Sequence, residues 1–185
     1  MNYQQTYQSI LAECNIALAK VREEDIKQCI ELILQADKVF FIGVGRVKLE
    51  IEAFAKRLSH LGIYTVIVGQ ITEPAMTDRD ILIVASGSGE SLIPVAIAQK
   101  AKTIGGKIIH FGSNPHSSLA PITDLMVRIP VQTKLYLQDE VQSEQPMSSL
   151  FEQSLLLLGD TIAKMIVEKK EIQLKNLWKF HANLE

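Results

Sequence analysis

The strongest constraint on the fold is a repeated alternation of short apolar runs with helical patterns. Amphipathic helical patterns occupy 49–61 and 92–104. Five runs of β-branched and other apolar residues surround them, at 39–42, 64–68, 81–85, 107–111 and 125–129. Such runs are typical of parallel strands that are covered on both faces of their sheet. The alternation predicts an α/β fold, a three-layer α-β-α sandwich with right-handed crossovers and a five-stranded parallel sheet.

The remaining segments are expected to frame this sheet. Two amphipathic helices, 3–19 and 23–35, come first, and a long helix at 148–168 comes last. The polar loop 132–145 is too long for a simple connection, and loops of this length often carry function. We therefore predict a single domain over 1–185, with leading helices at 1–36, a parallel core at 37–130, a closing helix at 146–170 and a C-terminal tail at 171–185.

Composition narrows the classes of function. The 19 Lys and Arg residues nearly balance the 21 Asp and Glu residues, so there is no basic field for nucleic acid or an anionic membrane. No apolar run approaches the ~18 residues of a membrane span, and residues 1–5 lack the features of a secretory signal. We expect a cytoplasmic protein.

The two cysteines are predicted to be reduced and partly buried. Cys14 and Cys29 both fall in expected helices. Neither has a CxxC partner or a nearby histidine at ligand spacing, so we expect no disulfide framework and no metal site.

The clearest chemical feature is the stretch Ser86-Gly87-Ser88-Gly89-Glu90-Ser91, which follows the third strand and opens a helix. Its glycines let backbone N–H groups converge, and the helix N-terminus adds unpaired donors and a positive dipole end. Three hydroxyls add further donors, so the stretch predicts a cradle for one phosphate group. The alternative is a plain helix cap on Ser88 or Ser91. A cap needs one such residue, not three with interleaved glycines.

The sequence does not match the glycine-rich motifs that bind dinucleotides or nucleoside triphosphates. Gly43-Val44-Gly45 follows the first strand, but Lys48 stands where GxGxxG needs its third glycine. Gln70 follows the second strand, where a dinucleotide site places an acid. The sequence also lacks GxxxxGK[ST]. We exclude NAD and P-loop nucleotides and expect no cofactor.

Several stretches beyond this loop are distinctive: 57–62, 113–115, 129–134, 145–153 and 181–185. Together with the serine-glycine loop in a parallel α/β domain, they give a chain that resembles the sugar isomerase (SIS) domain family, whose fold is flavodoxin-like. Within it, the chain resembles the 6-phospho-3-hexuloisomerases. The resemblance implies a homotetramer or homodimer that interconverts 3-hexulose 6-phosphate and fructose 6-phosphate without metal or nucleotide.

The first loop departs from the family pattern Gly-x-Gly-Arg-Ser-Gly. Gly45 and Arg46 are kept and are expected to bind substrate, whereas Val47 and Lys48 replace the serine and the glycine. The serine is expected to contact substrate, and a lost buried donor costs on the order of 1–3 kcal/mol. Lys48 offsets this loss if it acts as a point charge for phosphate. Otherwise the chain is a non-catalytic or altered-specificity module that binds a sugar phosphate.

Moving a carbonyl between C2 and C3 through an enediolate needs a base, a shuttle for the hydroxyl proton and donors for the oxyanion. Glu152, one turn into the closing helix, is the first candidate for the base because it matches the family's Phe-Glu-Gln segment. The alternative is a glutamate that the helix dipole favours. His181 in the tail is a candidate proton shuttle that reaches a neighbouring subunit. His60, near a helix end, has either a catalytic or a structural role.

Polar residues also follow the fourth strand, at the same edge of the sheet. Ser113 and Asn114 are expected to contact the sugar hydroxyls. His110, inside the strand, is expected in the core or at an interface. Trp178 and Phe180 flank Lys179 in the tail, and we expect them to pack on a neighbouring subunit rather than on nucleic acid.

Overall fold

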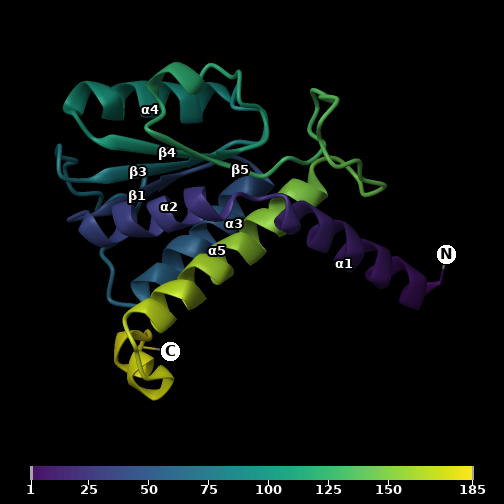
Figure 1. Ribbon diagram of the computed structural model, residues 1–185. Helices are drawn as coiled ribbons and strands as arrows, with labels where there is room; N and C mark the ends of the chain where they lie inside the picture. Colours follow the sequence, from purple (N-terminus) through teal and green to yellow (C-terminus); the bar gives the residue numbers. More distant parts are fainter. Residues whose placement is uncertain (1, 185) are drawn as a thin grey trace.

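A computed structural model describes residues 2–184, and it has the expected three layers (Figure 1). The elements follow one another in the order α1 (Tyr3–Ala19), α2 (Glu23–Gln35), β1 (Val39–Ile42), α3 (Arg46–Ser59), β2 (Thr65–Ile67), β3 (Ile81–Ala85), α4 (Leu92–Ile104), β4 (Lys107–Gly112), η1 (Ala120–Ile122), β5 (Leu125–Arg128), α5 (Ser149–Lys169) and η2 (Leu174–Phe180).

All five strands are parallel and lie in the order β2-β1-β3-β4-β5. This is the flavodoxin-like order of a doubly wound sheet, so the predicted fold class is confirmed. The connections from β1 and from β3 leave in opposite directions. The crevice between them, beyond the carboxyl ends of the strands, is where such sheets bind ligands.

The strands are buried on both faces because successive side chains point to opposite sides. Phe41 faces the layer of α1, α2, α3 and α5, where it meets Phe54 edge to face at 5.8 Å between ring centroids. Phe40 faces the layer of α4, where it packs with Ala98 and Leu119. Figure 1 shows α4 on one side of the sheet and α2, α3 and α5 on the other. Two apolar cores thus hold the sheet from both sides and fix its carboxyl edge.

Helix α3 begins three residues earlier than the apolar pattern predicts. The backbone at Gly45 has a φ of +62°, which lets the chain turn directly from the strand end into the helix at Arg46. In this first turn Val47 is only partly buried: it lies at the margin of the core and also lines a cavity. The helix end also differs from prediction, since α3 ends at Ser59 with His60 as its C-cap.

The two cysteines, Cys14 and Cys29, are free and buried, in line with the expected reduced thiols. Burial raises the pKa of Cys29 to about 12. Within residues 2–184, no helix is long and apolar enough to span a bilayer.

Candidate functional site

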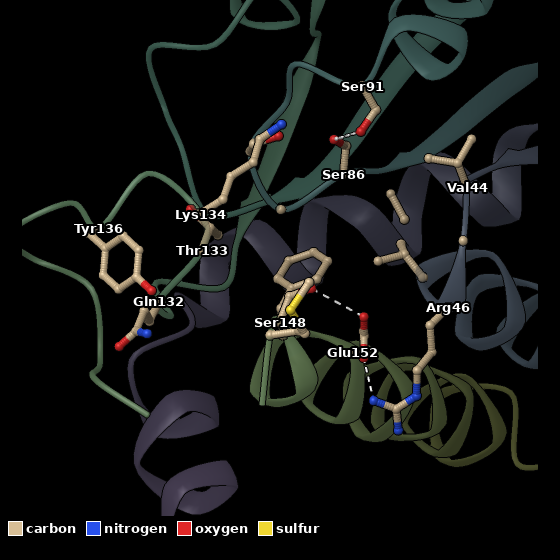
Figure 2. A pocket seen from close by; sticks show the side chains of 17 residues that line it. Val44, Arg46, Ser86, Ser91, Gln132, Thr133, Lys134, Tyr136, Ser148 and Glu152 are labelled. Carbon is tan, nitrogen blue, oxygen red and sulfur yellow. Dashed lines mark hydrogen bonds and ion pairs between the residues drawn. The ribbon is translucent and has the colours of Figure 1, made fainter. Parts of the chain in front are cut away.

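A cavity of about 430 Å³ opens at the carboxyl edge of the sheet, beside the point where the strand order reverses (Figure 2). Four segments line it: the loop after β1, the loop after β3, the polar loop after β5 and the start of α5. The lining residues are Val44, Gly45, Arg46, Val47, Ala85, Ser86, Gly87, Ser88, Ser91, Gln132, Thr133, Lys134, Tyr136, Met147, Ser148, Phe151 and Glu152.

The phosphate loop, Ser86–Ser91, forms one wall of this cavity. Ser91 is at the N-cap position of α4, but its side chain makes no capping hydrogen bond. It accepts a hydrogen bond from the Ser86 hydroxyl instead, at 3.2 Å. Gly89 has a φ of +68°, and a Cβ there would collide with the Ser117 side chain. Ser91 therefore does not cap α4 through its side chain, and the loop places three serine residues along the cavity wall.

Residues after β4 support the phosphate loop from behind. The Gly87 carbonyl accepts hydrogen bonds from the backbone N–H of Ser113 at 2.8 Å and of Asn114 at 3.2 Å. The Asn114 amide donates to the Ser88 carbonyl at 3.2 Å. Neither Ser113 nor Asn114 lines the cavity. In this structure these groups hold the loop, and contact of Ser113 and Asn114 with sugar hydroxyls stays a prediction.

His110 completes this support. It is buried in β4, and its Nε2 lies 3.0 Å from the Ser86 carbonyl oxygen, so this nitrogen carries the hydrogen. Burial lowers the pKa of His110, which favours the neutral ring. His110 is thus a core residue, one of the two roles expected, and it fixes the start of the phosphate loop.

Glu152 lies on the first turn of α5, across the cavity from the phosphate loop (Figure 2). It is buried, and its carboxylate forms an ion pair with Arg46 at the start of α3. The Ser148 hydroxyl donates to its other oxygen at 3.2 Å. Arg46 is half exposed and also donates to the Ser149 hydroxyl at 3.3 Å. The site therefore pairs a buried carboxylate with a cation facing solvent.

The two departures in the β1–α3 loop have different surroundings. Val47 lines the cavity, where it offers an apolar surface in place of a hydroxyl. Lys48 does not line the cavity, and its ammonium group lies 3.6 Å from the Glu52 carboxylate, one turn along α3. The expectation that Lys48 compensates for the missing serine is therefore not supported.

Comparison with known proteins identifies the family to which the chain belongs. The model of the SIS domain matches residues 32–157. The chain belongs to the SIS domain family. The 3-hexulose-6-phosphate isomerase of Bacillus subtilis is 37% identical over 95% of both chains. The 3-hexulose-6-phosphate isomerase of Mycobacterium gastri is 37% identical over 90% of this chain and 83% of that one.

A solved structure agrees with this assignment. A Methanococcus jannaschii protein, whose structure is described as inferring a molecular function of 3-hexulose-6-phosphate isomerase, is 28% identical with a TM-score of 0.83. The match covers 98% of this chain and 99% of that chain. The predicted family and the isomerase class of enzyme are confirmed.

The SIS cavity also contains residues to which the sequence assigned no role, above all Lys134 with its neighbours Gln132, Thr133 and Tyr136. Hydrogen bonds from Ser118, and then the charge of Lys134, lower the pKa of Glu90 in the phosphate loop. Lys134 thus places a positive charge near the loop. The available signal was the unusual length of the polar loop, but length does not tell which of its residues turn inward.

The two candidate histidines lie elsewhere in the SIS domain. His60 and His181 stack with their ring centroids 5.3 Å apart. They share a second cavity, of about 440 Å³, with the aromatic tail residue Trp178. Because α3 has 14 residues at about 1.5 Å each, His60 is about 20 Å from Arg46. A single chain therefore does not bring either histidine to Glu152.

The tail packs on its own chain in this structure. Phe180 lies against Gly62, where a Cβ would come within 2.8 Å of the ring. Trp178 remains 73% exposed. Among residues 2–184, no group of three or more His, Cys, Asp or Glu side chains is arranged to hold a metal ion.

Proposed function

We propose that this SIS protein interconverts 3-hexulose 6-phosphate and fructose 6-phosphate in the cytoplasm, as a homotetramer or homodimer. One observation carries the proposal: a phosphate cradle and a buried carboxylate face each other across one cavity. The names of the relatives from Bacillus subtilis and Mycobacterium gastri support the choice of substrate.

The phosphate group would bind in the cradle of Ser86, Ser88 and Ser91. All three serines line the cavity, and the 13-residue helix α4 begins beside them, where the first N–H groups of a helix lack partners within the helix. Lys134 adds a point charge from the opposite loop. Neutral donors, a helix dipole and one cation together suit a single dianionic group.

The carboxylate of Glu152 would then move the proton. In the 3-ketose, it removes the proton from C2, and the electron pair of the C–H bond forms the C2–C3 double bond. The C3 carbonyl oxygen becomes an enediolate oxygen. Return of the proton to C3, with transfer of the hydroxyl proton from the C2 oxygen to the C3 oxygen, gives the 2-ketose. Atoms and charge balance without a redox step.

The oxyanion and the hydroxyl protons need further groups. The Arg46 guanidinium lines the cavity beside Glu152, so it is positioned to stabilise the enediolate oxygen. His181 or His60 of a neighbouring subunit would carry the proton between the two oxygens. This arrangement makes the assembled oligomer the catalytic unit.

The experiment is isotope exchange. The protein is incubated with fructose 6-phosphate in D₂O, and deuterium entry at carbon is followed by NMR. We expect exchange with the wild type and none above background with Glu152→Gln. Glu168→Gln, at the exposed far end of the same helix, is the matched control and should exchange like the wild type. Absence of exchange in the wild type would refute the proposal.

Val47 favours a second candidate, an SIS module with altered specificity or without turnover. An apolar side chain in the cavity cannot donate a hydrogen bond to a sugar hydroxyl. A panel of ketose and aldose phosphates, assayed for both binding and isomerisation, separates the two. Tight binding of one sugar phosphate with no turnover of any would favour this second candidate.

A further inference from the structure

One buried carboxylate has no part in the proposed chemistry. Glu140 is 5% exposed and lies within the polar loop that supplies Thr133 and Lys134 to the cavity. We infer that Glu140 is a positioning residue that holds this loop against the phosphate loop and thereby sets the affinity for the substrate's phosphate group. The inference rests on the proposed function for the identity of the ligand.

The Glu140 carboxylate accepts four hydrogen bonds. One carboxylate oxygen accepts from the Ser113 hydroxyl at 2.8 Å and from the Thr133 hydroxyl at 3.3 Å. The other accepts from the backbone N–H of Leu137 at 2.9 Å and of Thr133 at 3.3 Å. Four donors converge on the two carboxylate oxygens. Only a side chain with two acceptor oxygens, such as a carboxylate, satisfies all four donors. Since the carboxylate is buried, these bonds also replace its lost hydration.

These bonds join the two walls of the cavity. Ser113 is the residue whose backbone N–H supports the phosphate loop through the Gly87 carbonyl. Thr133 packs with its methyl group over Gly87, where a Cβ would lie 3.2 Å away, and it directly precedes Lys134. Glu140 therefore connects the support of the phosphate loop to the residue that positions the nearby lysine.

Other bonds hold the base of the polar loop without Glu140. Val141 donates to the Pro130 carbonyl at 2.8 Å, and Gln132 donates to the Val141 carbonyl at 2.9 Å. The later part of the loop is bound by Glu13 of α1, whose carboxylate accepts from the Ser143 hydroxyl at 2.6 Å. Loss of Glu140 is therefore expected to displace Thr133 and Lys134 while the loop stays attached.

Glu140→Gln tests the inference. The amide can keep its oxygen toward the two N–H groups, but its NH₂ then faces the two hydroxyls and reverses their bonds. We expect KM for fructose 6-phosphate to rise about tenfold, as for one weakened contact to a charged group. We expect kcat to change less than about threefold, because Glu152 lies on a separate element. Glu144→Gln removes an exposed carboxylate from the same loop and should change neither.

A direct binding measurement separates this inference from the proposed function. Calorimetric titration with fructose 6-phosphate gives Kd whether or not the protein turns the sugar over. A Kd ratio of about ten between Glu140→Gln and wild type supports the inference even if isotope exchange fails. An unchanged Kd in a folded variant overturns it, as does a parallel fall of kcat with no change in KM.

Ser113→Ala is a second test of the inference, to be used if the Glu140→Gln variant does not fold. It removes one hydroxyl donor, leaves the carboxylate in place and keeps the backbone N–H that supports the phosphate loop. We expect Kd to rise about threefold, since one of four donors is lost. A Kd equal to that of the wild type would overturn the inference.

Discussion

Two cavities of nearly equal volume, about 430 and 440 Å³, lie at opposite ends of helix α3. The first gathers hydroxyls, a lysine and a buried carboxylate at the carboxyl edge of the sheet. The second lies beside the C-terminus of α3, where Arg57 and two histidines meet an aromatic tail. Size does not separate them. What separates them is their place in the fold: parallel strands bring their loops to one edge of the sheet, and only the first cavity lies at that edge.

The comparison also suggests how the two cavities are related. Neither histidine reaches Glu152 within one chain, yet both belong to stretches that resemble the hexuloisomerases. If the second cavity of one subunit meets the first cavity of another, the two are halves of one site. The following predictions test this relation, from the largest expected effect to the smallest.

The largest effect is expected at the base in the first cavity. Glu152→Gln should lower kcat for fructose 6-phosphate by about 10²–10⁴-fold, the usual contribution of a general base. KM should change little, because the phosphate loop is untouched. Steady-state kinetics beside Glu168→Gln check this, and a loss below tenfold would remove Glu152 from the role of base.

The second prediction is that the two cavities form one active site between subunits. His181→Ala should lower kcat about a hundredfold if the tail supplies the proton shuttle. When inactive Glu152→Gln chains and inactive His181→Ala chains are unfolded together and refolded, mixed oligomers should regain activity. Activity then comes from sites that combine one intact half from each chain. Failure of the mixture to regain activity would separate the two cavities.

The third prediction concerns phosphate affinity and contrasts two lysines. Lys134→Met should raise KM for fructose 6-phosphate about tenfold, because it removes the cation beside the phosphate loop. Lys48→Met should leave KM unchanged, since Lys48 pairs with Glu52 outside the cavity. Equal effects of the two substitutions would contradict the assignment of the cavity lining.

The smallest effect is a pH dependence of stability. The pKa of His110 is lowered in the folded chain by burial, so below about pH 6.5 the unfolded chain binds a proton that the folded chain resists. Stability should therefore fall as pH drops below 6.5, by at most about 1.4 kcal/mol per pH unit from this group. Urea unfolding at pH 5.5 and 7.5 measures it.

His110→Gln is the control for this pH dependence. The Gln Nε2 can keep the donor that faces the Ser86 carbonyl but cannot titrate. The slope of stability with pH should be smaller in this variant. An equal slope would assign the pH dependence to other groups.

Much of the fold could be predicted because the signals are local. The runs at 39–42 and 81–85 are apolar on both faces, and both are observed as fully buried strands. The phosphate loop was equally visible, since a strand end, two glycines and a helix start fall within six residues. Each of these features depends on neighbours along the chain, where sequence patterns are most informative.

The sequence is less informative where a side chain's role depends on packing. Ser113 and Asn114 follow a strand at the correct edge, but their groups are already bonded to the phosphate loop. Lys134 lines the cavity because the long polar loop folds back toward the phosphate loop, and residue type does not reveal that path. Neither fact can be inferred from residue type and position alone.

The sequence by itself therefore determined the parallel sheet and its two cores, and it predicted an anion cradle at one end of β3. Only the tertiary structure decided which residues face the cradle. Val47 and Lys48 are adjacent on one helix, yet they point about 100° apart, so one lines the cavity and the other meets solvent. That direction follows from how α3 docks on the sheet and on α5, and docking is set by contacts between residues far apart in the chain.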